Sequence, residues 1–150
     1  MLTPDLMHDY QKRAVNFQCS MPETALWLDP GLGKTVTTLT SAAHLLNTGF
    51  LRGVLVVAPI RVCRLVWKQE SKKWAHLHHL NFMLMTGTRD QRTRALLKDG
   101  THIWLINYEN LGWLAETLHT YFIAKDRPLP FDGLVWDEIS KCKNSATQRV

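Results

Sequence analysis

The chain has 150 residues, enough for one domain, and 45% of them are apolar while 21% are charged. This composition excludes a disordered, collagen-like or coiled-coil protein. The chain has no run of about 18 apolar residues and no signal peptide at its start, so we expect a cytoplasmic protein without a membrane span. Its three cysteines, Cys19, Cys63 and Cys142, lack CxxC spacing, which favours free thiols in a reducing compartment.

The net charge is +5, and the basic residues are concentrated in two segments. Two segments are basic, each with a single acidic residue: 61–73 holds Arg61, Arg64, Lys68, Lys72 and Lys73, and 89–98 holds Arg89, Arg92, Arg94 and Lys98. Such segments could bind a polyanion such as nucleic acid, or they could simply be solvated helix faces. Charge alone leaves both interpretations open.

Short apolar runs alternate with amphipathic segments along the chain. The sequence predicts, in order, a helix over 6–17, a strand over 25–28, a helix over 35–46 ending near Gly49, a strand over 54–58, a helix over 62–74, strands over 82–85 and 103–106, a helix over 110–122, a loop over 126–132 and a strand over 133–136. Runs this short, apolar on both faces, are typical of a buried parallel sheet. The alternation predicts an α/β fold with right-handed crossovers.

A glycine-rich loop is the strongest local signal in the sequence. The segment 28–35 reads Leu-Asp-Pro-Gly-Leu-Gly-Lys-Thr and lies between a predicted strand and a predicted helix. Gly31 and Gly33 allow backbone N–H groups to approach phosphate oxygens, and the helix start adds its positive dipole end. Lys34 would reach the β- and γ-phosphates, and Thr35 would ligate Mg²⁺. The strict pattern begins with a glycine where this chain has Leu28; the alternative is a structural glycine turn that caps a helix.

The last predicted strand ends in two carboxylates, Asp137 and Glu138. Because carboxyl ends of parallel strands share one edge of a sheet, this pair is expected beside the phosphate-binding loop. Asp137 would hold Mg²⁺ and Glu138 would orient and deprotonate the attacking water. An apolar run that ends in two acids could also be a solvated turn, but the order of the two motifs favours the nucleotide-binding interpretation.

These segments resemble the N-terminal RecA-like lobe of superfamily-two helicases, and within it the Swi/Snf-like DNA-dependent ATPases, especially compact phage and bacterial members. The segments that carry the resemblance are, in family order, 9–15 (the glutamine motif), 28–35 (motif I), 56–59 with Trp67 and Trp74 (motif Ia), 106–109 (motif Ib) and 137–140 with Lys143 and Asn144 (motif II). The resemblance covers nearly the whole chain, as one domain over residues 1–150.

The resemblance implies a RecA-like P-loop NTPase lobe with a mostly parallel sheet flanked by helices. It places ATP and Mg²⁺ on Gln11 at the adenine, on Gly31, Leu32, Gly33, Lys34 and Thr35 at the phosphates, and on Asp137 at the metal. Lys34 and Glu138 would be the catalytic residues. Double-stranded DNA would cross the same sheet edge near Arg61 and Tyr108, held mainly through its phosphates.

The chain departs from the family pattern in two places. The fourth residue of motif II is Ser140, where the family often has a histidine that helps to connect hydrolysis with nucleic-acid binding. The printed residues also include neither the family's motif III nor its second lobe with the arginine fingers of motif VI; we read the Ser-Ala-Thr at 145–147 as a coincidence. The lobe therefore needs a second RecA-like lobe, in cis or in trans, for hydrolysis.

Three functions remain in competition. The favoured one is the ATP-binding lobe of a DNA-dependent ATPase or translocase in the cytoplasm of a bacterium or phage-infected host. The alternative is a naturally truncated, non-catalytic module that binds nucleotide or nucleic acid. An unrelated small-molecule kinase is disfavoured because no lid or acceptor site is visible.

Other aromatic residues are expected to be structural. We assign Trp27, Trp104 and Trp136 to the core, and we expect Trp67 and Trp74 to lie on one helical face against the sheet rather than to stack on bases. The cluster of His76, His78 and His79 is expected to be a polar turn that closes the 62–74 helix rather than a metal site.

Overall fold

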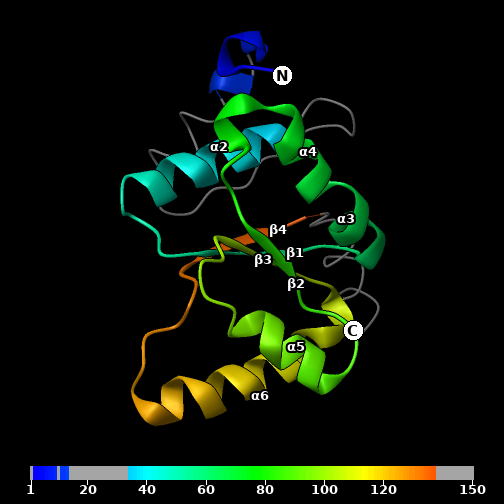
Figure 1. The fold of residues 1–150 in the computed structure, drawn as a ribbon, viewed down its shortest axis with the longest axis vertical. Coiled ribbons are helices and arrows are strands. Elements are labelled where there is room, and N and C mark those ends of the chain that lie inside the picture. The colour runs from blue at the N-terminus through cyan, green and yellow to red at the C-terminus, as the bar shows by residue number, and fades with distance from the viewer. Residues whose placement is uncertain (1, 10, 14–33, 138–150) are drawn as a thin grey trace, which may run out of the picture.

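A parallel four-stranded sheet forms the centre of the computed structural model, which describes residues 2–9, 11–13 and 34–137 (Figure 1). The strands are β1 (Val54–Val57), β2 (Phe82–Leu84), β3 (Ile103–Ile106) and β4 (Gly133–Trp136), in the spatial order β2-β3-β1-β4. Each coincides with a predicted strand, and all described pairings are parallel. The α/β expectation is confirmed; the predicted strand over 25–28 lies outside the described residues.

Helices cover both faces of this sheet (Figure 1). On one face lie α2 (Lys34–Asn47), α3 (Ile60–Leu65) and α4 (Trp67–Lys73); on the other lie α5 (Arg89–Leu96) and α6 (Leu111–Tyr121). Short 3-10 turns connect these elements: η1 (Pro4–Leu6), η2 (Ala75–Leu77), η3 (Tyr108–Asn110) and η4 (Ile123–Lys125).

The alternation of side chains along β1 divides the core into two clusters. Val54 and Val56 pack with the helices of the α2 face, while Leu55 and Val57 pack with those of the α6 face. All four residues of β1 and of β3 are buried, as predicted for central strands covered on both sides.

Close backbone contact at Gly53 fixes β4 beside β1. The Gly53 carbonyl accepts hydrogen bonds from the N–H groups of Asp132 and Gly133, both at 3.1 Å. A Cβ atom at Gly53 would collide with the Pro130 carbonyl oxygen and the Trp104 ring, so only glycine fits. The two strands then run in register, from Val54 opposite Gly133 to Val57 opposite Trp136, and their carboxyl ends meet.

Strand β4 corrects one prediction about the core. Its residues alternate between half-buried and exposed, and Leu134 (56% exposed) and Trp136 (38% exposed) are only partly covered. The assignment of Trp136 to the core was therefore wrong, whereas that of Trp104 is confirmed. Within the described part of the sheet β4 is an edge strand, and the described helices do not cover both of its faces as they do for β1 and β3.

The predicted helix over 62–74 is two helices, α3 and α4, which meet at Val66. Trp74 follows α4 in an extended conformation, so Trp67 and Trp74 do not share the face of one continuous helix. Both rings are nevertheless buried in the cluster on the α2 face, which confirms that they pack against the core. The break leaves Leu65 and Val66 exposed while Trp67 enters the core.

The beginnings and ends of the helices can be compared with the sequence signals that mark them. Helix α2 ends at Asn47, and Gly49 follows with a φ of 80°, the left-handed conformation that favours glycine after a helix. Helix α5 was not predicted as a helix; its signal is a capping box in which Thr88 and Gln91 satisfy each other's backbone N–H groups. The predicted N-terminal helix begins later than expected, since Leu6 lies in η1 with an exposed side chain. Residues 10 and 14–17 of this predicted helix lie outside the described residues.

Candidate nucleotide and nucleic-acid site

Three predicted segments meet at the carboxyl edge of the sheet. The Asp137 N–H donates to the Val57 carbonyl at 2.8 Å, and the Ala58 N–H donates to the Ile106 carbonyl at 3.0 Å. The residues that follow β1, β3 and β4 are thereby aligned, which brings the start of α3, the start of η3 and Asp137 to one side of the molecule. Ligands collect at this edge in open α/β sheets.

Asp137 is a buried carboxylate, with only 5% of the residue exposed. Its Oδ2 accepts a hydrogen bond from Trp67 Nε1 at 3.2 Å, and its main-chain carbonyl accepts one from the Tyr108 hydroxyl. The aspartate is therefore held from two elements, α4 and η3, that approach it from different parts of the chain. A carboxylate oxygen is the kind of ligand that Mg²⁺ prefers, so the residue fits its predicted role.

Tyr108, a predicted DNA contact, also binds Asp137, the predicted metal ligand. Besides its bond to Asp137, its ring stacks on Trp136 with centroids 6.0 Å apart and an interplanar angle of 18°. Tyr108 is half-buried, so part of it faces solvent at the edge where nucleic acid is predicted. This tyrosine joins the ends of β3 and β4, a link that the sequence did not predict.

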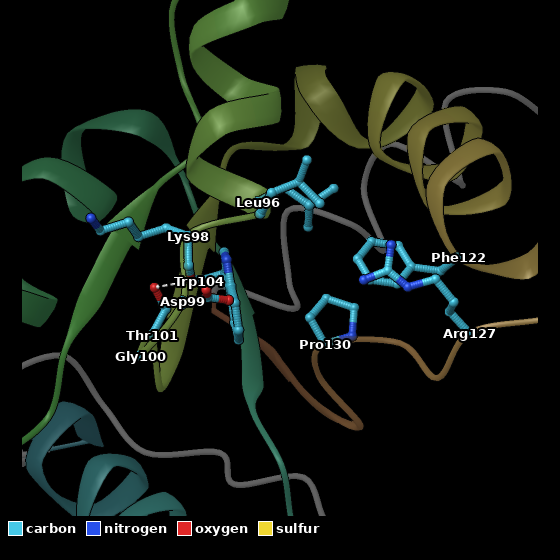
Figure 2. A pocket seen from close by; sticks show the side chains of 10 residues that line it. Leu96, Lys98, Asp99, Gly100, Thr101, Trp104, Phe122, Arg127 and Pro130 are labelled. Carbon is cyan, nitrogen blue, oxygen red and sulfur yellow. Dashed lines mark hydrogen bonds between the residues drawn. The ribbon is translucent and has the colours of Figure 1, made fainter. Parts of the chain in front are cut away.

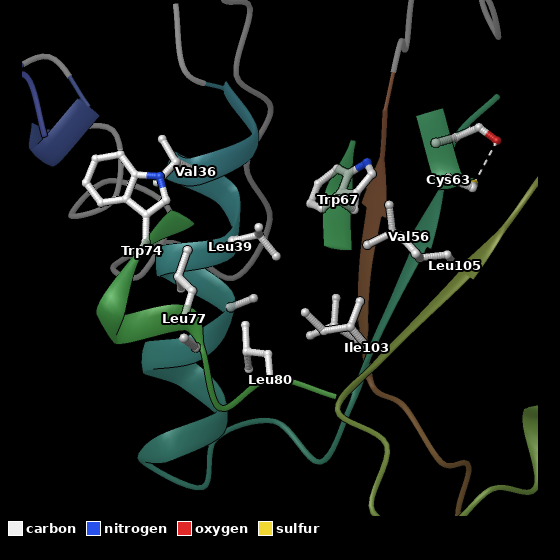
Figure 3. Close-up of a cluster of buried hydrophobic side chains, with 14 of the residues drawn as sticks. Val36, Leu39, Val56, Cys63, Trp67, Trp74, Leu77, Leu80, Ile103 and Leu105 are labelled. Atoms are coloured by element: carbon white, nitrogen blue, oxygen red, sulfur yellow. Dashed lines mark hydrogen bonds between the residues drawn. The ribbon is translucent and has the colours of Figure 1, made fainter. Parts of the chain in front are cut away.

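The predicted phosphate-binding helix starts on the same side as Asp137. Lys34 is the first residue of α2 and Thr35, half-buried, follows it, whereas Gly31, Leu32 and Gly33 lie outside the described residues. Val36, one residue beyond Thr35, belongs to the same buried cluster as Trp67 (Figure 3). Trp67 also donates a hydrogen bond to Asp137, so the first turn of α2 and the aspartate border the same buried cluster.

Gln11 lies in an N-terminal segment that packs on α2. It is buried, and its Oε1 accepts a hydrogen bond from the His8 N–H at 2.9 Å. Met7, in the same segment, accepts a weak hydrogen bond from Thr40 of α2. Glu138, the predicted catalytic base, and Ser140 lie outside the described residues.

The basic segment over 61–73 forms an exposed face on α3 and α4. All five of its basic side chains are exposed, whereas its buried residues (Cys63, Trp67 and Ser71) point into the core. Arg61 stands at the start of this face, four residues after the end of β1 and so at the edge that holds Asp137. One ion pair, Lys73 with Glu70 at 3.3 Å, neutralises part of the charge at the far end.

In the second basic segment, 89–98, not all of the basic side chains are exposed. Arg89, Arg94 and Lys98 are exposed, but Arg92 lies 4.7 Å over the Trp113 ring and donates to Asn110 Oδ1 at 2.6 Å. Arg92 therefore attaches α5 to α6. Its role is structural, and this segment presents a weaker cationic surface than the first.

Cys63 is a buried thiol that sequence reasoning left without a role. Its Sγ donates to the carbonyls of Ala58 and Ile106, both at 3.5 Å. Burial, and to a lesser degree the negative charge of Asp137, raises the pKa of the Cys63 thiol to about 11. The cysteine therefore fastens α3 to the ends of β1 and β3 and is not a nucleophile at neutral pH.

The histidine cluster closes α4 as the predicted polar turn, η2. His76 Nε2 is 2.8 Å from the Thr40 hydroxyl, which ties this turn to α2. Burial, followed by the neighbouring His79, lowers the pKa of His76. Among the described residues no group of three or more His, Cys, Asp or Glu side chains is arranged to hold a metal.

A separate pocket of about 190 Å³ opens at the opposite, amino edge of the sheet (Figure 2). It is lined by the turn before β3, by Trp104 and Phe122, and by Arg127 and Pro130. Apart from Lys98 of the second basic segment, none of the predicted nucleotide or nucleic-acid residues contributes to it. The predicted site is thus defined by strand ends and helix starts, and this hollow is not part of it.

The combination of a parallel sheet with helices on both faces, a helix that begins with Lys34 and Thr35, and a buried aspartate at the end of a strand defines a RecA-like lobe. The model of the SNF2-related domain family matches residues 10–150, and the chain belongs to this family. The resemblance to a Swi/Snf-like N-terminal lobe is thereby confirmed.

The known proteins to which the chain is similar include a phage protein and the core of a SWI2/SNF2 ATPase. It is 30% identical over 136 residues to "Putative protein p41" of Acyrthosiphon pisum secondary endosymbiont phage 1, a match over 90% of this chain and 28% of that protein. It also resembles the Sulfolobus solfataricus SWI2/SNF2 ATPase core in complex with dsDNA, with a TM-score of 0.57, 27% identity and coverage of 70% of this chain and 22% of that one. The chain spans less than a third of either relative.

No described helix is both long enough and apolar enough to cross a membrane.

Proposed function

We propose that residues 1–150 form the ATP-binding lobe of a Swi/Snf-like, double-stranded-DNA-dependent ATPase or translocase that hydrolyses ATP when joined to a second lobe. The observation that carries the proposal is the buried Asp137 at the end of β4, held on the side where α2 begins with Lys34 and Thr35. The S. solfataricus relative, an ATPase core in complex with dsDNA, supports the nucleic-acid part.

In this proposal the nucleotide binds along the carboxyl edge of the sheet. Gln11 contacts adenine, the 31–35 segment surrounds the phosphates, and Lys34 neutralises the β- and γ-phosphates. Thr35 and Asp137 would hold Mg²⁺ through their side-chain oxygen atoms, and the bound ion would supply positive charge beside the phosphate oxygens. Arg61 and Tyr108 contact DNA at the same edge.

Hydrolysis then needs a base and a second source of positive charge. Glu138 accepts a proton from water while the water oxygen bonds to the γ-phosphorus and the bond to the β–γ bridging oxygen breaks, which leaves ADP and inorganic phosphate. Arginines from the second lobe stabilise the charge that develops on the transferring group.

Calorimetric titration of the purified chain with ATP and Mg²⁺ tests the nucleotide site. Lys34→Ala should weaken binding by about ten- to a hundredfold, because it removes charge-assisted hydrogen bonds to phosphate. The control is Lys98→Ala, an exposed lysine at the pocket on the opposite edge, which should bind as the parent does. Equal affinity in parent and Lys34→Ala would overturn the assignment.

A further inference from the structure

We infer that Trp67 is a positioning residue: its indole N–H orients the Asp137 carboxylate toward the Mg²⁺ of the bound nucleotide. The inference deepens the proposed function and rests on it. Trp67 is 1% exposed, and its Nε1 lies 3.2 Å from Asp137 Oδ2, so the donor and the acceptor of this hydrogen bond are both buried.

The indole suits this task because it can only donate a hydrogen bond and never accepts one. It therefore constrains one carboxylate oxygen as an acceptor and restricts rotation of the aspartate side chain. The ring itself is held in the cluster that contains Val36, Val56 and Leu105 (Figure 3). A donor fixed by core packing orients its partner more firmly than a mobile surface side chain would.

The main chain of Asp137 is fixed separately. Its N–H binds the Val57 carbonyl and its carbonyl accepts the Tyr108 hydroxyl, so the backbone is held to the ends of β1 and β3. With the backbone fixed, the direction of the carboxylate depends on side-chain rotation, which the Trp67 contact limits. Residues that hold a metal ligand in this way commonly alter metal affinity about 10–100-fold when mutated.

The chain contains a matched control seven residues away. Trp74 is also buried and its Nε1 also donates to a carboxylate oxygen, Glu70 Oε1, at 3.3 Å. Glu70, however, lies on α4 within the basic face and has no part in the proposed nucleotide site. Trp67→Phe and Trp74→Phe each remove one indole N–H and a similar buried volume, but only the first should affect Mg²⁺.

The experiment measures the Mg²⁺ concentration that gives half-maximal binding of a non-hydrolysable ATP analogue, together with the midpoint of thermal unfolding. Trp67→Phe should require about tenfold more Mg²⁺ than the parent. Trp74→Phe should stay within about twofold, even though both variants lose thermal stability from the lost buried contacts. Asp137→Asn, in which the metal ligand itself is weakened, sets the upper limit of the effect.

A second measurement keeps the test decisive if Trp67→Phe does not fold. In parent protein with ¹⁵N-labelled tryptophan, adding Mg²⁺ to the analogue complex should shift the indole N–H resonance of Trp67 and leave that of Trp74 in place. Asp137→Asn should abolish this response.

The outcomes separate the two claims. If the parent does not bind the analogue with Mg²⁺, the proposed function fails and the inference fails with it. If the parent binds but Trp67→Phe and Trp74→Phe need the same Mg²⁺ concentration, or the Trp67 resonance does not respond, only the positioning role is overturned.

Discussion

At the scale of single residues, the carboxylate at the end of β4 organises its surroundings. Asp137 receives an indole N–H from Trp67 and a hydroxyl from Tyr108, which connects the proposed metal ligand with the segments of motifs Ia and Ib. In the family resemblance, Ser140 replaces a histidine that often connects hydrolysis with nucleic-acid binding. The contact between Tyr108 and Asp137 directly links a residue that we propose as a DNA contact to the proposed metal ligand.

Removing the charge of Glu138 and removing that of Asp137 should change ATP hydrolysis in different ways. With the second lobe supplied, Glu138→Gln should retain ATP and lower hydrolysis by about 10²–10⁴-fold, because an amide cannot accept the proton of water. Asp137→Asn should instead raise the Mg²⁺ concentration that gives half-maximal turnover, because it weakens the proposed metal ligand. Steady-state phosphate release across a Mg²⁺ series checks both, and turnover at the parent rate by Glu138→Gln would mean that another residue is the base.

Cys63 should make the stability of the protein depend on alkaline pH. Burial raises the pKa of its thiol from 9.0 to about 11, so the folded state holds this proton more tightly than the unfolded state. Its contribution to the free energy of unfolding is complete below pH 9.0 and is lost as the pH rises toward 11. Urea unfolding at pH 8 and at pH 10.5 should therefore show a larger loss for the parent than for Cys63→Ala.

Because the parent and Cys63→Ala share all other titrating groups, the effects of those groups on stability cancel in the comparison. Parallel decreases in stability for the two proteins would show that the thiol titrates normally in the folded state. Alanine also removes a buried sulfur, so Cys63→Ala is expected to be less stable at both pH values, and only the difference between the two pH values is used.

At the scale of helices and strands, the two sides of the α3–α4 pair have different roles. One side of the pair places Cys63, Trp67 and Ser71 in the core, and the other presents five exposed cations. A helix face with this charge, at the edge that holds Asp137, suits the phosphates of DNA. The solvated-face interpretation remains the competing one, and salt dependence distinguishes them.

Arg61→Ala should weaken binding of the chain to double-stranded DNA of any sequence and reduce the slope of log affinity against log salt by about one unit. Fluorescence anisotropy with a labelled duplex at several salt concentrations checks this. The control is Arg52→Ala, which removes an exposed arginine before β1 that pairs with Asp132 at 3.9 Å, at the opposite edge of the sheet. Equal losses for Arg61→Ala and Arg52→Ala would indicate non-specific attraction to net charge rather than a DNA site at α3.

At the scale of the whole molecule, residues 1–150 supply only the proposed nucleotide site, and the proposed reaction also needs a second lobe. The printed chain should therefore bind ATP weakly and hydrolyse it hardly at all, with little stimulation by DNA. The missing arginine contribution is worth roughly 10³–10⁵ in rate for arginine fingers in general. Adding the second lobe, fused or as a separate chain, should restore DNA-stimulated turnover.

A phosphate-release assay on highly purified chain measures this, with Lys34→Ala as the control for contaminating ATPases. Turnover that disappears in Lys34→Ala, yet is robust in these 150 residues alone, would show that the site completes itself and would contradict the two-lobe account.

The sequence by itself determined the strands and the family. Runs such as 54–58 and 103–106 are apolar throughout because both faces of a central parallel strand are buried, a local property that composition records. The order of the motifs identified the SNF2-related family. The sequence also predicted that α2 ends near Gly49, because glycine tolerates the left-handed conformation found there.

Only the tertiary structure decided which side chains meet. The bond between Trp67 and Asp137 joins residues 70 positions apart, and that between Tyr108 and Asp137 joins residues 29 apart. No local periodicity encodes such pairs, because strand order and register set them. For the same reason Trp136, apolar and in a strand, was wrongly assigned to the core: the sequence shows that a strand is apolar, but its position in the sheet decides whether it is covered.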